Sequence, residues 1–346
     1  IHVEQQVALV APQIARSSQG LDAAGGGPAT GHSFGLMINR FDWGGDREDF
    51  AGRVASVARR AESAGFRDLW VMDHFRQIPR VGRAWEDMPE AHTTLSFLAG
   101  VTDTIRLGAL VTAITHRHPL VLGKMVATLD VVSGGRANLG LGIGWDSAEH
   151  AGYGIQFPDT AARYEILEDT LDALPLLWGK GAPGYQGRTF TASELVCYPR
   201  PIQEQIPILV GGSGEQKTLR LVARKARACN LFGRPEVVAN KVRVLAEHCA
   251  EVGRDRDEIE VTHLVDTLTA RDRNRLRQRV EELRGRNVSA AEYAARHNAG
   301  TVDDQVAHLS SYREAGATHT IVVLPDLHLE DSIESFAEVI QRMSGP

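Results

Sequence analysis

The chain has 346 residues, 43% of them hydrophobic, which is enough for a large core, and 38 basic against 44 acidic side chains give a net charge of −6. This balance argues against a nucleic-acid surface as the main function, and no apolar run approaches the length of a membrane span. Cys197, Cys229 and Cys249 are odd in number and lack metal-ligand spacing, so we expect reduced thiols in a cytoplasmic protein.

The first 32 residues differ in kind from the rest. They are rich in Ala, Gly, Gln and Ser, and they show neither a core pattern nor a basic segment leading an apolar one. Such a composition is typical of flexible chain. We therefore expect a flexible N-terminal extension over residues 1–32 and a single domain over residues 33–346, since no linker divides the remainder.

From residue 33 onward, short apolar runs alternate with helical patterns. The predicted buried strands are Phe34–Ile38, Asp68–Met72, Ile105–Thr112, Ala137–Ile143, Ile206–Val210, Ala228–Phe232, Ile259–Leu268 and His319–Leu324. The predicted helices are Arg47–Ala64, Ala91–Thr102, Pro119–Val132, Tyr164–Trp178, Glu215–Ala226, Pro235–Val252, Val302–Ala315 and Leu329–Ile340. Strict alternation implies parallel strands, so the pattern predicts an α/β fold, a (β/α)8 TIM barrel.

Two segments are too long for ordinary barrel loops. Residues 179–207, after the fourth helix, carry Pro and Gly throughout, and we expect them to form an active-face insertion that covers a ligand. A second insertion precedes the seventh helix. Its basic run, Arg271–Arg286, is expected to be a solvated helical face.

Glycines concentrate where the fourth and fifth strands end. Gly211, Gly212, Ser213 and Gly214 lie between an apolar strand and a helix, where close backbone approach and free N–H groups hold a phosphate. The alternative for such a loop is a plain strand-to-helix turn. With the glycines of Gly140–Gly144, the pattern favours a flat ligand that carries a phosphate tail.

Several motifs occur in the order found in one known superfamily. They are Asp73-His74-Phe75, Leu107-Gly108 with Val111-Thr112, Arg117-His118-Pro119, Ser133-Gly-Gly-Arg136, Gly140–Trp145 with Glu149-His150 and Tyr153-Gly154, Pro199-Arg-Pro201, and Gly211–Glu215 with Thr218-Leu219. On these motifs the chain resembles the luciferase-like monooxygenase superfamily from about Ser33 to its C-terminus. The resemblance is closest to the coenzyme F420-dependent oxidoreductases.

The resemblance implies roles for individual residues. His74 matches the family histidine over the cofactor ring, a candidate catalytic proton donor or acceptor, and Asp73 matches its cofactor-contacting partner. A non-proline cis bond is implied between Leu110 and Val111, forming a bulge under the ring, and Thr112 would face the ring edge. The remaining cofactor-binding matches are Gly142, Gly144, Trp145, Gly211, Gly212, Ser213 and Gly214. The implied substrate pocket contains Trp43, His92, Glu149 and Tyr153.

Two departures from the family pattern bear on the substrate. Sugar-phosphate dehydrogenases of the family carry a glutamate at the position of Trp145, so a sugar phosphate is not the expected substrate. Many relatives carry a tryptophan at the position of His92, so the pocket is expected to differ there.

The implied function is that of an F420-dependent oxidoreductase. It transfers a hydride between the deazaflavin and a small or mid-sized organic substrate, and His74 manages one proton. The alternative is an FMN-dependent two-component monooxygenase supplied by a partner reductase. Less favoured are a non-redox barrel lyase or isomerase and a non-catalytic flavin binder. The family also implies a homodimer, and neither a nucleic acid nor a membrane is an expected partner.

Several candidate residues also have structural interpretations. Glu149 suits a structural hydrogen bond as well as substrate contact, and a helix-capping loop is the favoured interpretation of His116 and His118. Asp73 and His74 could form a zinc site with His116 or His118, but no ligand spacing supports it, so no metal is expected.

Overall fold

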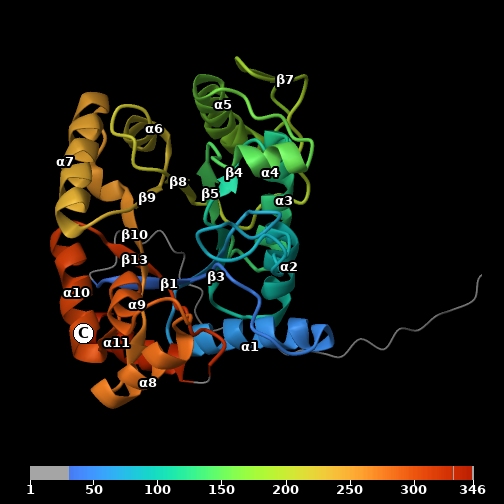
Figure 1. Cartoon of the computed structure of the whole chain (residues 1–346). Helices are drawn as coiled ribbons and strands as arrows, with labels where there is room; N and C mark the ends of the chain where they lie inside the picture. The colour runs from blue at the N-terminus through green and yellow to red at the C-terminus, as the bar shows by residue number, and fades with distance from the viewer. Residues whose placement is uncertain (1–30, 330, 345–346) are drawn as a thin grey trace, which may run out of the picture.

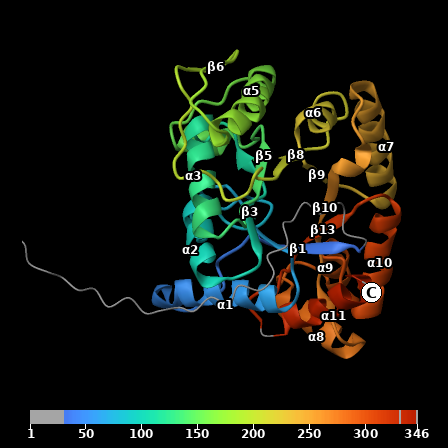
Figure 2. The same cartoon turned by 180° about the vertical axis from the view of Figure 1, so that it is seen from behind.

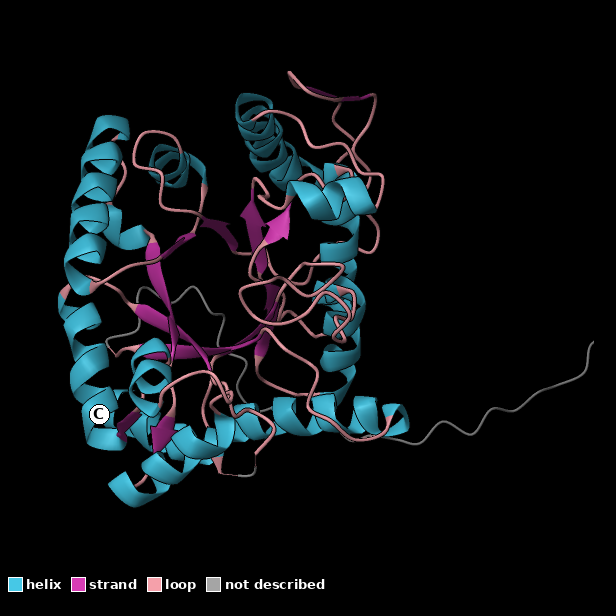
Figure 3. Cartoon of the chain, in the orientation of Figure 1, coloured by secondary structure: helices cyan, strands magenta, loops and turns pink. Residues whose placement is uncertain are grey.

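A computed structural model of the chain describes residues 31–329 and 331–344. One parallel sheet forms its centre, and helices surround that sheet (Figure 3). Its strands are β1 (Ser33–Ile38), β2 (Asp68–Val71), β3 (Arg106–Ala109), β4 (Thr112–Ala113), β5 (Leu139–Gly142), β8 (Ile208–Gly211), β9 (Ala228–Leu231), β10 (Glu260–Asp266) and β13 (His319–Val323).

The sheet runs in the order β3-β2-β1-β13-β10-β9-β8-β5-β4, and a parallel bridge between Leu107 and Ala137 brings its two ends together. β3 and β4 are two halves of the single strand predicted over Ile105–Thr112. They are separated at the peptide between Leu110 and Val111, which is cis, as the resemblance implied. The nine strands therefore occupy eight barrel positions, which confirms the predicted (β/α)8 barrel.

The helices that follow the barrel strands lie on the outside of the barrel (Figures 1 and 2). They are α1 (Phe50–Ser63), α2 (Ala91–Val101), α3 (Pro119–Val132), α5 (Thr160–Trp178), α6 (Thr218–Lys225), α7 (Pro235–Val252), α10 (Val302–Glu314) and α11 (Ser332–Ser344). Pro119 and Pro235 stand in the first turns of their helices, where a missing N–H costs nothing. Three short elements lie in the loops of the barrel: η1 (Arg47–Asp49), η2 (Arg256–Glu258) and α4 (Ser147–Gly152).

Most of the N-terminal extension expected over residues 1–32 lies outside the described residues. Its last residue, His32, is 4% exposed, and its Nε2 lies 2.8 Å from Thr320 Oγ1. Among the helices of the described ranges, none combines the length and apolar character needed to cross a membrane.

The insertion over residues 179–207 packs on the outside of the barrel. It contains the antiparallel hairpin β6 (Tyr185–Gln186) and β7 (Thr191–Ala192). Asp130 of α3 anchors it, because one carboxylate oxygen accepts the backbone N–H groups of Ile202 and Gln203 at 2.7 and 3.0 Å. The insertion is thus held against α3, and none of its residues lines the cavity described below. That it covers a ligand stays a prediction.

The second insertion contains β11 (Thr269–Ala270), α8 (Arg273–Leu283), α9 (Ala290–Arg296) and β12 (Gly300–Thr301). The prediction of a solvated face over Arg271–Arg286 is wrong for Arg279, whose side chain is 0% exposed. Arg279 forms ion pairs with Asp326, which is 1% exposed, and with Asp331. Both acids lie beyond β13, and a guanidinium can be buried here because it meets carboxylates on that side.

We predict that Arg279→Met lowers the free energy of unfolding by about 3 kcal/mol, because it leaves the carboxylate of Asp326 buried without its charged partner. Urea unfolding followed by circular dichroism measures the effect. The control is Arg277→Met on the exposed side of the same helix, expected to change stability by less than about 0.5 kcal/mol. Equal stabilities of the two variants would contradict a structural role for the buried ion pairs.

Candidate active site

A cavity of about 350 Å³ lies at the carboxyl ends of the barrel strands. This is the end at which TIM-barrel enzymes place their chemistry. The described residues that line it are Met72, Asp73, His74, Ile78, Leu110, Val111, Ala113, His116, Gly142, Ile143, Gly144, Trp145, Asp146, Glu149, His150, Gly211, Gly212, Asn230, Phe232 and Leu264.

One wall of the cavity is formed by Val111 and two glycines of neighbouring strands. A Cβ atom at Gly142 would lie 2.6 Å from Val111 Cγ2, and one at Gly211 would lie 2.8 Å from Val111 Cγ1. Both distances are far shorter than an ordinary contact, so any larger residue would displace Val111. Gly212 adopts φ +124°, in the left-handed region that favours glycine. The wall is therefore backbone plus one branched side chain.

Asp73, which follows β2, binds β4 and the loop after β4 at this end of the barrel. One of its oxygens accepts hydrogen bonds from the Ala113 N–H at 3.2 Å and from Arg117 Nη1 at 2.8 Å, and it lies 3.2 Å from His116 Nδ1. Burial alone would raise the pKa of Asp73. The hydrogen bonds from His116 and Arg117 outweigh burial and hold this pKa below its ordinary value, so the group is a carboxylate.

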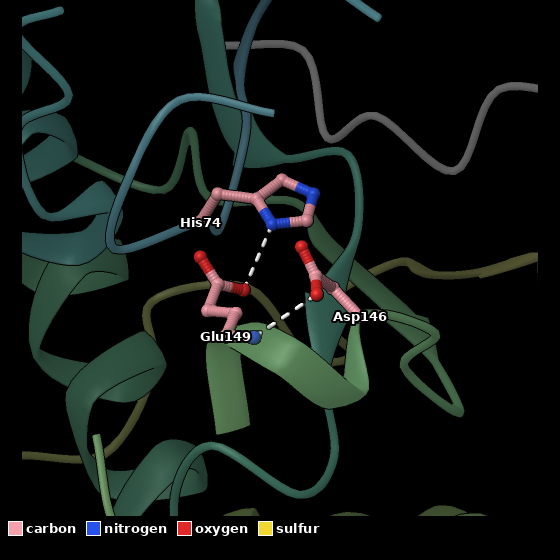
Figure 4. Close-up of side chains that lie close together, drawn as sticks. All are labelled: His74, Asp146 and Glu149. Atoms are coloured by element: carbon pink, nitrogen blue, oxygen red, sulfur yellow. Dashed lines mark hydrogen bonds and ion pairs between the residues drawn. The ribbon is translucent and has the colours of Figure 1, made fainter. Parts of the chain in front are cut away.

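Glu149, on α4, holds His74 in place (Figure 4). Glu149 Oε2 lies 2.9 Å from His74 Nδ1, and Oε1 accepts the N–H of Phe75 at 2.8 Å. The Glu149 side chain is 1% exposed and that of His74 is 15% exposed. Burial would raise the pKa of Glu149, but the hydrogen bond from His74 and the charge of that ring, followed by the Phe75 N–H, lower it below its ordinary value.

Asp146 lies beside this pair in Figure 4. Its Oδ1 accepts the Glu149 N–H at 3.0 Å, which caps α4. Candidate ligand atoms of His74, Asp146 and Glu149 lie within 4.8 Å of one another, and within the described ranges these residues alone form such a group. Hydrogen bonds within the group already engage His74 Nδ1 and both acids, and these bonds account for how closely the three side chains lie.

His116 is not the capping residue that we expected. Its side chain is 2% exposed, its Nδ1 faces Asp73, and its Nε2 lies 3.6 Å from Glu149 Oε2 with no hydrogen-bond partner in the described part of the chain. His118 does cap α3, accepting the Leu120 N–H at 3.2 Å. The signal for His116 is its position directly after the third barrel strand, where active-site residues of a barrel lie.

The other sequence-predicted site residues fall into two groups. Leu110, Gly144 and Trp145 line the cavity with the residues above. Thr112, His92, Trp43, Tyr153, Ser213 and Gly214 do not line it. Thr112 and His92 are buried behind the wall, with Oγ1 3.2 Å from Nε2, and Tyr153 donates its hydroxyl to the Phe75 carbonyl at 2.9 Å.

Sequence reasoning missed the far side of the cavity. Asn230, Phe232 and Leu264 come from the sixth and seventh barrel strands. The signal was present, because Phe232 follows a predicted strand directly. The predicted site ended with the loop after the fifth strand, so these residues lay outside it.

Comparison with known proteins places the chain among relatives. A profile described as luciferase-like monooxygenase matches residues 34–332. The chain is 30% identical over 214 residues to the uncharacterized protein Rv0953c of Mycobacterium tuberculosis, covering 58% of this chain and 75% of that protein. It is 26% identical over 328 residues to an F420-dependent glucose-6-phosphate dehydrogenase of Microbacterium testaceum, covering 87% and 96%. It is 28% identical over 205 residues to the pyrimidine monooxygenase RutA of Stutzerimonas stutzeri, covering 58% and 56%.

Solved structures share the fold. The coenzyme F420-dependent tetrahydromethanopterin reductase from Methanopyrus kandleri superposes with a TM-score of 0.71 at 22% identity, over 90% of this chain and 99% of that one. The EDTA monooxygenase EmoA from Chelativorans sp. BNC1 gives 0.76 at 16% identity, over 91% and 95%. Both likenesses support the barrel architecture.

We predict that Asp73→Asn destabilises the protein by about 2 kcal/mol at pH 7, because it removes an ionised acceptor from buried donors. A carboxyl group whose folded pKa is lowered contributes stability above its unfolded pKa and loses it as pH falls through the folded value. The difference between wild type and variant should therefore shrink below about pH 4. Urea unfolding at pH 7 and in acid measures it.

The control for that experiment is Asp257→Asn, a side chain that is 81% exposed and expected to match the wild type at both pH values. A difference for Asp73→Asn that stays constant with pH would show that ionisation of Asp73 does not stabilise the fold.

Proposed function

Because the chain belongs to the luciferase-like monooxygenase family, whose profile covers residues 34–332, we propose that it is an F420-dependent oxidoreductase. It would transfer a hydride between the deazaflavin and a small or mid-sized organic substrate. Membership makes it an enzyme of the flavin- or deazaflavin-dependent oxidoreductase class, and F420 in place of FMN is our proposal. The F420-dependent relative supports this choice, since its alignment covers 96% of its length against 56% for RutA.

The cavity fits a flat ring with a phosphate tail. Val111, Gly142 and Gly211 would hold the ring, because together they present a wall with few side-chain atoms. The tail phosphate would bind to backbone N–H groups of Gly212–Gly214, just before α6. When bound, a deazaflavin accepts or supplies a hydride, and this chemistry leaves one proton to be managed.

The observation that carries the proposal is the hydrogen bond between His74 and Glu149. An ionised Glu149 accepts the proton of His74 Nδ1, so Nε2 is left as the basic nitrogen of the ring. His74 can then take a proton from an alcohol that is being oxidised and return it in the reverse reaction. Glu149 does not move the proton itself. It fixes the tautomer and stabilises the imidazolium that forms.

Trp145 contacts the same histidine. Its indole ring meets the His74 ring edge to face, with centroids 5.6 Å apart, and it is 58% exposed. A half-exposed aromatic ring that touches the proposed proton carrier is positioned to contact a substrate as well. We therefore propose Trp145 as a substrate contact.

The FMN-dependent monooxygenase is kept as the second candidate because RutA is among the relatives. That function would require a partner reductase and would consume oxygen, whereas hydride transfer with F420 requires neither. A homodimer belongs to the proposal for both candidates.

We predict that the purified protein binds oxidised F420 at about micromolar Kd and binds FMN at least tenfold more weakly. Fluorescence titration measures both. Gly211→Ala should weaken F420 binding about tenfold or more, because the new Cβ would lie 2.8 Å from Val111 Cγ1. Gly52→Ala in α1 is the control, because its Cβ meets no atom within 4 Å.

Each outcome of the titration decides between the candidates. Tight FMN binding with weak F420 binding would move the protein to the monooxygenase function, which oxygen uptake would then check. Binding of neither cofactor would overturn the cofactor assignment. Light scattering on the same sample should give twice the mass of the 37.7 kDa chain.

We predict that His74→Ala lowers kcat about 100-fold or more for any substrate found by screening alcohols and activated alkenes, while F420 affinity changes less than about threefold. Added imidazole should restore part of the turnover, because it can enter the space that the missing ring leaves. Glu149→Gln should lower kcat by a smaller factor of about ten, since His74 remains but loses its charged partner.

Turnover of His74→Ala at the wild-type rate would exclude His74 as the proton carrier. Equal losses of kcat and of F420 affinity in both variants would indicate a damaged fold, which circular dichroism spectra would reveal.

A further inference from the structure

The lining of the cavity as a whole is acidic. The described lining residues include three carboxylates, Asp73, Asp146 and Glu149, and three histidines, His74, His116 and His150. They include neither a lysine nor an arginine. An anionic group of a substrate would therefore find no fixed cation on the wall.

Two arginines near the cavity lining are already engaged. Arg117 pairs with both Asp73 and Glu90. Arg163 is 8% exposed, and it donates to the carbonyls of Ile143 and Gly144. Turning either guanidinium toward a substrate would leave its present acceptors unpaired, which is unfavourable.

The three acids differ in how they are balanced. Asp73 is paired with Arg117, and Glu149 with His74. No ion pair joins Asp146 to a basic side chain in the described ranges, and its carboxylate accepts the backbone N–H of Glu149. Asp146 is partly exposed, so its charge faces the cavity and the solvent beyond it.

Two partly exposed aromatic rings belong to the cavity lining. Trp145 precedes Asp146 in the chain and is 58% exposed, and Phe232, from the strand across the cavity, is 48% exposed. Leu264 and Ile78 add apolar side chains to the lining. An aromatic face next to an uncompensated carboxylate attracts cations, because the ring quadrupole and the charge act in the same direction.

We propose that the substrate site of this cavity takes a largely apolar molecule without an anionic group, and that it prefers a cationic group bound between Asp146 and Trp145. Amines, amidines and neutral alcohols fall in this class, whereas carboxylates and phosphate esters do not. The identity of the reaction rests on the proposed function, but the charge preference rests on the wall alone.

The phosphate tail of the cofactor is not an exception to this preference. It is assigned to the backbone N–H groups of Gly212–Gly214, which bind an anion through dipoles and need no cation. The relative named for glucose-6-phosphate acts on an anionic sugar, so this chain should differ from it in substrate charge.

Three probes of the same planar shape test the proposal: benzamidine, a cation at neutral pH, benzamide, which is neutral, and benzoate, an anion. Binding to the full chain is measured by calorimetry and by tryptophan fluorescence, with and without saturating F420. We expect the order benzamidine, benzamide, benzoate, with benzoate at least about tenfold weaker than benzamide. Benzoate binding as tightly as benzamide would overturn the proposal.

A pair of matched variants assigns the preference to Asp146. Asp146→Asn keeps a helix-capping side chain on α4 and removes the charge. It should weaken benzamidine about fivefold and change benzamide less than twofold. Asp159→Asn is the control, since Asp159 caps α5 in the same way but does not line the cavity. Unchanged benzamidine binding in Asp146→Asn would overturn the role of Asp146.

The outcome is independent of the cofactor. If the protein failed to bind F420, the proposed function would fall, while the ranking of the probes on the cofactor-free protein would still support or overturn the charge preference.

Discussion

Two buried carboxylates hold the active face of this barrel together. Asp73 follows β2 and accepts a hydrogen bond from Ala113 of β4, whereas Glu149 follows β5 and accepts one from Phe75, again beyond β2. A buried carboxylate is stable only when donors surround it. The loops after three barrel strands therefore cannot move apart without exposing a charge to an apolar interior. His116 lies between the two acids, with Nδ1 3.2 Å from Asp73 and Nε2 3.6 Å from Glu149, and His74 is held by Glu149.

The need to surround buried carboxylates with donors also determines which ligands the cavity can accept. Arg117 is paired with Asp73 and Glu90, so its guanidinium stabilises the fold and is not available to a ligand. On the opposite wall the constraint is steric, because Val111 fits only where Gly142 and Gly211 lack side chains. One side of the cavity is thus shaped for close contact with a flat molecule and the other for proton transfer. This division suits an enzyme in which cofactor and substrate meet face to face.

Much of the fold could be predicted from the sequence, because each strand and helix leaves a local signal. Alternation of apolar runs and helical patterns was enough to place the eight barrel strands, and Pro119 and Pro235 mark helix starts that the structure confirms. Asp73, His74 and the cis peptide after Leu110 came from a resemblance to known proteins, which local patterns alone could not have supplied.

What the sequence could not predict depends on partners far along the chain. Arg279 reads as one more surface arginine until Asp326, 47 residues later, meets it inside the protein. His116 looks like a capping residue unless Asp73, 43 residues earlier, is known to face it. The insertion over residues 179–207 likewise depends on a distant partner, since Asp130 of α3, 72 residues before Ile202, holds it.

An acidic lining and an anionic cofactor are compatible when the phosphate binds backbone N–H groups instead of the loops that carry the acids. A phosphate beside Asp146 or Glu149 would be repelled, with an energy that grows as the dielectric falls inside a closed cavity. The glycines after β8 offer N–H groups on a different strand from the acids, which follow β2 and β5. Binding the tail at β8 therefore leaves the acidic side to the substrate. A substrate that brought its own anion would have to enter on that side, where the described lining holds neither a lysine nor an arginine, whereas a cation would meet Asp146, which forms no ion pair within the described ranges.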